Sequence, residues 1–195
     1  MSGAVAKPQI AAIVGSNRRD SLNRKLARAL IGLGASRFDA VILRIEDLPL
    51  YNQDHETPLP AAVTRFKNAL SAADGVLMVT PEHNRSIPAV LKNAIDWGTR
   101  PYGKNAWADK PAFITGTAPD AIGTALVQQH LRSVMTGLGM ILLGGQAYVT
   151  FKLDLIDEHG NIGDDSTKKF LADFVDRFAD LVTRLAPAVA QASAA

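Results

Sequence analysis

The chain has 195 residues, and its 21 lysines and arginines against 19 aspartates and glutamates give a formal net charge of +2. This near balance, without a long basic block, argues against a nucleic-acid-binding protein. Hydrophobic residues make up 47% of the chain and cysteine is absent, which predicts one globular domain over residues 1–195 and excludes disulfides, a thiolate nucleophile and cysteine-bound metals.

The chain alternates short apolar runs with segments of helical periodicity. Apolar runs that end at small or polar residues are typical of buried strands, and apolar residues repeated every three to four positions are typical of helices. In chain order we expect a strand over 8–14, a helix over 21–34, a strand over 39–45, a helix over 60–73, a strand over 75–80, a helix over 86–97, a strand over 110–115, a helix over 122–138, a strand within 140–149 and a helix over 167–185.

This alternation predicts an α/β fold. Apolar strands that each precede a helix indicate a parallel sheet covered by helices on both faces. Five such units favour a flavodoxin-like three-layer sandwich with a five-stranded parallel sheet of order 2-1-3-4-5. In such sheets ligands bind beyond the carboxyl ends of the strands, beside the switch point between strands 1 and 3. The alanine-rich tail, residues 186–195, is predicted to be disordered.

The loop after the first strand, GSNRRDSLN over residues 15–23, has the composition of an anion site. It leads into a helix, whose first N–H groups are unpaired and lie at the positive end of the helix dipole. Hydroxyls, amides and the Arg18 guanidinium add donors suited to a terminal phosphate. The alternative is a polar turn in which Ser21 only caps the helix. The motifs of nucleoside-triphosphate and dinucleotide loops are absent.

The loop after the third strand, residues 80–88, is polar and bounded by two prolines. Ser86 is expected to cap the following helix, with Pro88 in its first turn. His83 has three interpretations: a contact to a bound ligand, a solvated loop residue, or a metal ligand. The last is disfavoured because the other histidines show no ligand spacing with it, so no metal site is expected.

Three segments together resemble the NADPH-dependent FMN reductase family, and in particular its bacterial chromate- and quinone-reducing branch. They are GSNRRDSLN at 15–23, LPLYN at 48–52 and PEHNRSIPAVLKNAIDWGTRP at 81–101. The segment GTAPDAIGTALVQQHLR, residues 116–132, is similar to the same branch. The likeness runs from about residue 10 to residue 150.

The resemblance implies a flavodoxin-like domain that binds one FMN per subunit in a homodimer or homotetramer. It implies hydride transfer from NADPH or NADH to quinones, with adventitious reduction of chromate, other metal oxyanions and nitro or azo compounds. We expect a ping-pong mechanism, because donor and acceptor would use the same face of the flavin ring in turn. LPLYN would help a partner subunit to cover the FMN, or would pack on its own domain. We expect a cytoplasmic protein without membrane insertion, since no signal peptide or apolar span is evident.

The resemblance also assigns residues by position. The phosphate would be held by Ser16, Arg18, Ser21, Leu22 and Asn23. The flavin ring and its ribityl arm would be held by Pro81, Glu82, Asn84, Arg85 and Ser86, with Thr117 flanking the ring and His83 at the ring edge, where relatives often have tyrosine. Arg100 is a possible contact for an anionic substrate or, alternatively, a surface arginine at a helix C-terminus.

Two other functions stay open at this point. A flavin-binding electron carrier without its own NAD(P)H reaction shares the fold, but such carriers are usually strongly acidic, and a charge of +2 argues against one. A nucleotide-binding domain without flavin would use the same loop after the first strand. The flavin itself carries the redox chemistry in the favoured reading, so no protein residue is assigned a catalytic role with certainty.

Overall fold

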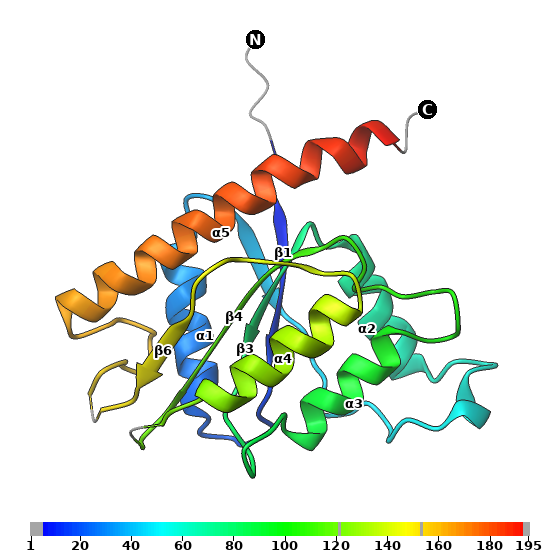
Figure 1. Ribbon diagram of the computed structural model, residues 1–195, viewed down its shortest axis with the longest axis horizontal. Helices are drawn as coiled ribbons and strands as arrows, with labels where there is room; N and C mark the ends of the chain where they lie inside the picture. The colour runs from blue at the N-terminus through cyan, green and yellow to red at the C-terminus, as the bar shows by residue number, and fades with distance from the viewer. Residues whose placement is uncertain (1–5, 121, 153, 193–195) are drawn as a thin grey trace.

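The computed structural model describes residues 6–120, 122–152 and 154–192, with side chains as far as residue 185 (Figure 1). Its strands are β1 (Gln9–Val14), β2 (Asp39–Ile42), β3 (Gly75–Val79), β4 (Pro111–Ala118), β5 (Ile141–Leu142) and β6 (Ala147–Thr150). Its helices are α1 (Leu22–Leu33), α2 (Ala61–Ala72), α3 (Ala89–Gly98), α4 (Ala125–Gly137) and α5 (Asp165–Ala192), with a 3-10 turn at Gln53–His55.

The sheet is parallel and has the order β2-β1-β3-β4-β5, which confirms the predicted topology. The expected single fifth strand is wrong in detail, because β6 also pairs with β4, and residues 143–146 separate β5 from β6. Gly144 and Gly145 lie in this break, and Gly145 has a φ of 87°. A residue with a positive φ cannot continue a regular strand, so the chain leaves the sheet here and returns to it at β6.

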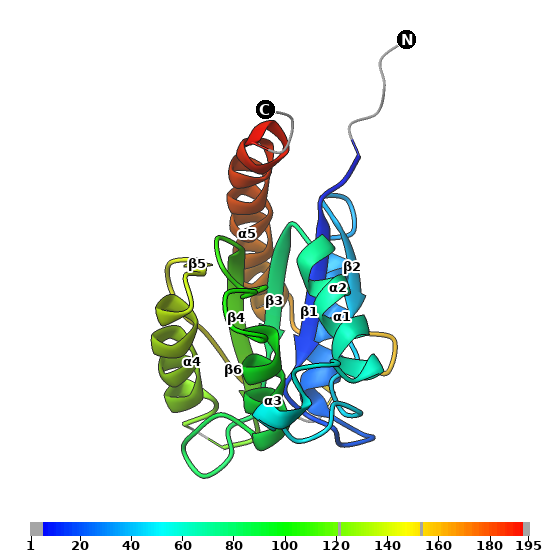
Figure 2. The same cartoon turned by 90° about the vertical axis from the view of Figure 1, so that its right-hand side faces the viewer.

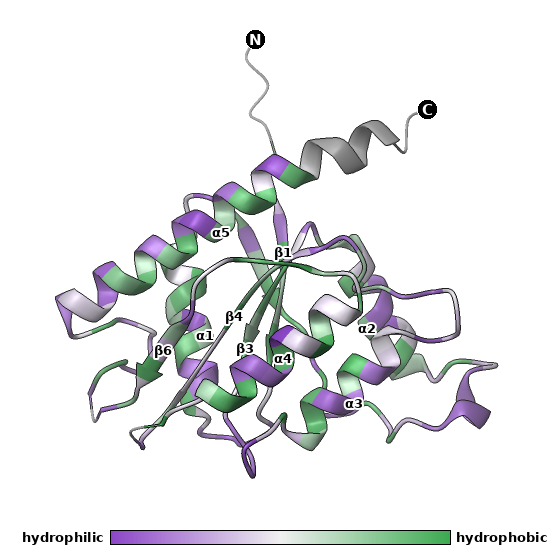
Figure 3. Cartoon of the chain, in the orientation of Figure 1, coloured by the Kyte–Doolittle hydropathy of each residue, from purple (hydrophilic) through white to green (hydrophobic). Residues whose placement is uncertain are grey.

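Helices cover both faces of the sheet (Figure 2). Ile10, Ala12 and Val14 of β1 belong to the core that contains α1 and α5. Ala11 and Ile13, which alternate with them, belong to the core that contains α2, α3 and α4. Figure 3 accordingly shows the strands as mainly hydrophobic and the outer sides of the helices as hydrophilic. The three-layer sandwich predicted from non-alternating apolar strands is confirmed.

Several element boundaries differ from prediction. α1 agrees closely, because the Ser21 hydroxyl accepts a hydrogen bond from the Arg24 N–H at 3.2 Å and caps the helix. β2 ends at Ile42, whereas β4 continues to Ala118. α5 runs to Ala192, past its predicted end at residue 185, and residues 193–195 lie outside the described part. The disorder expected over residues 186–195 stays a prediction.

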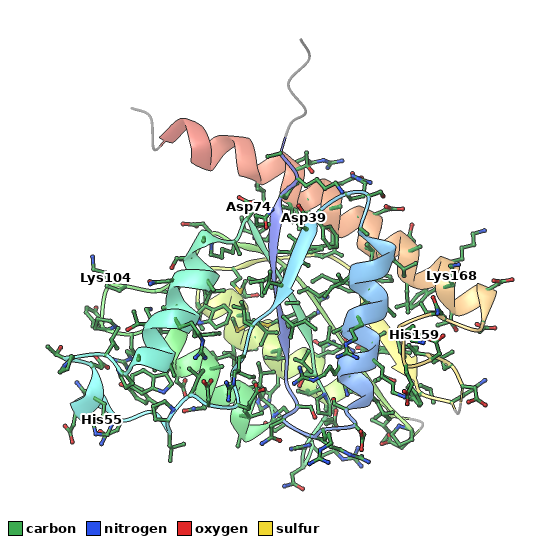
Figure 4. The ribbon with its side chains drawn as sticks, turned by 180° about the vertical axis from the view of Figure 1, so that it is seen from behind. Asp39, His55, Asp74, Lys104, His159 and Lys168 are labelled. Carbon is green, nitrogen blue, oxygen red and sulfur yellow. The ribbon has the colours of Figure 1, made fainter. Side chains whose placement is uncertain are left out.

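The two edges of the sheet differ in character. Near the amino ends of the strands, the Gln9 N–H donates to the Asp74 carboxylate at 2.7 Å, and Figure 4 shows Asp39 and Asp74 together there. The carboxyl ends meet at the opposite edge, where the loops lead into α1, α3 and α4. Among the described residues, none of the helices combines the length and apolarity of a membrane crossing.

Close strand packing at Gly116 leads to a stability prediction. A Cβ at this position would clash with the carbonyl oxygen of Thr80, which directly follows the neighbouring strand β3. We expect Gly116→Ala to lower the free energy of unfolding by about 1–3 kcal/mol, because the backbone must shift to admit the methyl group. Urea unfolding measures the change.

Gly137→Ala is the matched control, since nothing lies within 4 Å of a Cβ at this helical position. Alanine is favoured over glycine in a helix, so this variant should be unchanged or more stable by up to about 1 kcal/mol. Equal stabilities of the two variants would contradict the packing argument.

Candidate active site

A cleft of about 410 Å³ opens at the carboxyl ends of β1, β3 and β4. Its walls come from the loop between β1 and α1, the segment after β3 and the segment after β4. The residues that line it are Ser16, Asn17, Arg18, Ser21, Leu22, Asn23, Pro81, Glu82, His83, Thr117, Ala118, Pro119 and Asp120. A smaller cleft of about 200 Å³ beside β2 and α2 is lined mainly by aliphatic side chains, so it lacks the converging polar groups typical of a cofactor site.

The structure brings most of the residues expected at the site into one place. The expected residues that line the cleft are Ser16, Arg18, Ser21, Leu22, Asn23, Pro81, Glu82, His83 and Thr117. Four expected residues are not part of its lining: Asn84, Arg85, Ser86 and Arg100. Sequence reasoning did not assign Asn17, although it lies in the loop singled out after the first strand. It missed residues 118–120 because it ended the fourth strand three residues too early.

The first turn of α1 forms the anion-binding part of the cleft. Leu22 and Asn23 begin the helix, so their N–H groups have no acceptor in a preceding turn. The Ser16 hydroxyl accepts from the Arg18 N–H at 3.3 Å, which holds the loop in a tight turn beside them. Among the described residues, the Arg18 guanidinium forms no ion pair within 4 Å. This end of the cleft is therefore rich in donors and positive in potential.

Asn23 and Thr117 connect α1 to β4. The Asn23 amide donates to the Thr117 carbonyl oxygen and accepts from the Thr117 N–H, both at 2.9 Å. The Thr117 hydroxyl donates to the Val149 carbonyl oxygen at 2.8 Å. Both side chains are buried, so their polar groups are used within the protein. Asn23 retains its backbone N–H as a group to offer a ligand.

The segment after β3 forms a tight hairpin. His83 and Ser86 exchange two backbone hydrogen bonds, and Asn84 and Arg85 between them have φ values of 48° and 64°. Two successive positive φ values are the pattern of a type I′ turn. Asn84 and Arg85 are exposed at its tip, which explains why the tip is not part of the cleft wall.

The prediction that Ser86 caps α3 is wrong. Its hydroxyl forms a hydrogen bond of 3.0 Å with Nδ1 of His130 on α4, and α3 begins only after Pro88. The hairpin takes residues 83–86 out of helical geometry, because α3 would require negative φ values throughout. His130, an interior position of α4, therefore helps to fix the hairpin.

Glu82 joins a wall of the cleft to the start of α4. Its Oε2 atom accepts from the N–H groups of Leu126 and Val127, both at 3.0 Å, in the first turn of α4. Its Oε1 atom lies 3.4 Å from Arg85, and the side chain is only 7% exposed. No local pattern in the sequence predicts this contact, since the partners lie 44 and 45 residues apart.

Arg100 lies in a separate cluster with the LPLYN segment. Its guanidinium is 3.6 Å from Glu56 and 5.5 Å from the centre of the Tyr51 ring. The Tyr51 hydroxyl donates to Glu56 at 2.8 Å, and this hydrogen bond raises the pKa of the tyrosine. Within the LPLYN segment, Leu48 is buried and Leu50 is 83% exposed.

Comparison with known proteins agrees with this architecture. Residues 8–154 match the model of the NADPH-dependent FMN reductase family. The chain is 46% identical over 172 residues to a 2-hydroxy-1,4-benzoquinone reductase of Burkholderia sp., which covers 88% of this chain and 94% of that protein. It is 45% identical over 175 residues to a quinone reductase of Pseudomonas putida, which covers 89% and 94%.

A solved structure is similar over the same range. FerB, a flavoenzyme NAD(P)H:(acceptor) oxidoreductase from Paracoccus denitrificans, superposes with a TM-score of 0.88 at 42% identity and covers 91% of this chain and 98% of its own. The sheet order, the cleft at the switch point and these relatives agree with one another. The chain is therefore an oxidoreductase with a flavodoxin-like fold that belongs to the NADPH-dependent FMN reductase family.

Proposed function

We propose that this protein binds FMN in the cleft and passes hydride from NADPH or NADH through it to quinones. The observation that carries the proposal is the convergence of the α1 N-terminus with the segments after β3 and β4 in one cleft of about 410 Å³. This volume lies in the range of cofactor sites. The relatives named quinone reductase support the choice of acceptor.

The residues present fit the phosphate of FMN. The N–H groups of Leu22 and Asn23, the Ser16 hydroxyl and the Arg18 guanidinium all border one end of the cleft. Ser21 contributes through the cap that keeps the first turn of α1 in place. A dianionic phosphate gains from both the donors and the helix dipole.

The other walls fit the flavin ring. Pro81, Glu82 and His83 border the cleft on one side, and Thr117 with residues 118–120 borders it on another. FMN supplies two-electron hydride chemistry when it is bound, while the protein orients it and sets the charge around it. In this proposal Asn84, Arg85 and Ser86 form the rim, because they do not line the cleft.

The finer parts of the proposal concern kinetics and acceptors. Donor and acceptor would use the same face of the bound cofactor in turn, which gives ping-pong kinetics. Chromate, other metal oxyanions and nitro or azo compounds would react adventitiously, since reduced flavin passes electrons to many oxidants. A cytoplasmic location fits the supply of NAD(P)H.

The proposal also includes a single domain and a homodimer or homotetramer. The exposed Leu50 of the LPLYN segment is available for contact with a second copy. Light scattering of the purified protein tests this part, and a monomer at working concentration would remove it.

The first experiment is the visible spectrum of the purified protein, followed by chromatography of the heat-released cofactor. We expect a yellow protein that releases FMN and loses its colour when NADPH or NADH is added without oxygen. A bound flavin that NAD(P)H does not bleach would indicate an electron carrier. A colourless protein that also fails to bind added FMN would indicate a nucleotide-binding domain without flavin.

The phosphate contact leads to a prediction for Arg18. We expect Arg18→Ala to raise the Kd of the apoprotein for FMN about fivefold, which corresponds to about 1 kcal/mol, a value typical of an exposed charge pair. Fluorescence titration of FMN measures it. Arg19→Ala is the control, because the neighbouring arginine does not line the cleft. Equal effects of both variants would indicate general electrostatic attraction rather than a contact.

Arg100 tests the proposed contact with an anionic substrate. If it attracts one, Arg100→Ala should raise the KM for chromate or NAD(P)H several-fold and leave kcat unchanged, since such an interaction is made equally in ground and transition states. Steady-state kinetics measures both constants. Unchanged KM values would assign Arg100 only to its cluster with Glu56 and Tyr51.

A further inference from the structure

Glu82 is a carboxylate withdrawn from solvent at the wall of the cleft. Its side chain is 7% exposed, and its two oxygens contact different partners: the first turn of α4 on one side and Arg85 on the other. A buried carboxylate is costly unless hydrogen bonds or opposite charges compensate it. Here two backbone N–H groups and a guanidinium provide that compensation.

The N-terminus of α4 depends on this carboxylate. Thr124 occupies the N-cap position but makes no capping hydrogen bond. Its hydroxyl instead accepts from the Gln128 amide at 2.9 Å. Glu82 therefore caps α4 from a distant segment, and its negative charge opposes the partial positive charge of about half a unit at the helix end.

The same residue forms part of the cleft wall. Glu82 lies between Pro81 and His83, and all three border the cleft. Anchoring the Glu82 side chain to α4 holds this stretch of backbone in place. It also puts the full negative charge of Glu82 next to the wall that faces the ring in the proposed function, where the N-terminus of α4 offsets only part of that charge.

We propose that Glu82 is a positioning residue whose carboxylate sets the reduction potential of the FMN in the cleft. This inference rests on the proposed function. Reduced flavin carries more negative charge than oxidised flavin, so a nearby negative charge disfavours it. Removal of the Glu82 charge also leaves the partial positive charge at the N-terminus of α4 without its counter-charge. Both changes favour the reduced form of the flavin.

Glu82→Gln tests this inference, because glutamine keeps the shape and an acceptor oxygen for α4 but removes the charge. The holoprotein is titrated without oxygen against a reference dye, and the ratio of reduced to oxidised FMN is read from the visible spectrum. At equal dye potential we expect this ratio to rise about tenfold relative to wild type, which corresponds to about 30 mV for a two-electron couple.

Two further variants separate charge from other effects. Glu82→Asp keeps the charge but shortens the side chain. Its ratio of reduced to oxidised FMN should stay within about threefold of wild type, while its Kd for FMN rises several-fold. Glu158→Gln removes an exposed acid that does not line the cleft, and it should leave both quantities unchanged.

The outcomes are distinct. A wild-type protein that binds no FMN overturns the proposed function and this inference together. A wild-type protein that binds FMN and is reduced by NAD(P)H, but matches Glu82→Gln in its reduced-to-oxidised ratio, overturns this inference alone. An equal shift in Glu82→Asp also overturns it, because the charge would then not be the cause. If Glu82→Gln does not fold, Glu82→Asp decides: unchanged affinity for FMN overturns the positioning role.

Discussion

The burial of both faces of one parallel sheet is the constraint on which the rest of this structure depends. Parallel strands require a crossover connection after each strand. Helices on both faces bury the apolar side chains of β1, β3 and β4. All loops that lead from strand to helix then lie at one edge. β1 and β3 are neighbours in the sheet, but the helices that follow them lie on opposite faces. The loops after these two strands therefore diverge and leave a cleft between them.

Polar side chains at this edge of the sheet form hydrogen bonds within the protein as well as bordering the ligand cleft. The Asn23 amide is used in two hydrogen bonds with the backbone of Thr117 and thereby joins α1 to β4. The Glu82 carboxylate joins the segment after β3 to α4. Both residues border the cleft, yet their side chains hold its walls and leave backbone groups to face it. Both side chains have hydrogen-bond partners within the protein, and an unpaired buried polar group would cost free energy.

The location of the cleft was predictable from local patterns. Apolar runs and helical periodicity are properties of contiguous residues, so the order of elements, the capping of α1 by Ser21 and the loop after β1 follow from the sequence. The hairpin at 83–86 was not predicted, because nothing local requires Asn84 and Arg85 to adopt positive φ values. The division between β5 and β6 was missed because an apolar run does not show where its hydrogen bonding to the neighbouring strand β4 is interrupted.

The sequence by itself determined the fold class, the strand order and the edge that carries the site. The reason is that burial periodicity and crossover rules depend on segments and not on individual contacts. Tertiary structure alone decided which polar groups remain available to a ligand. Asn23 meets Thr117 across 94 residues, Ser86 meets His130 across 44, and Arg100 meets Glu56 instead of the cleft. Such pairings depend on how three layers pack in space, and no local pattern encodes them.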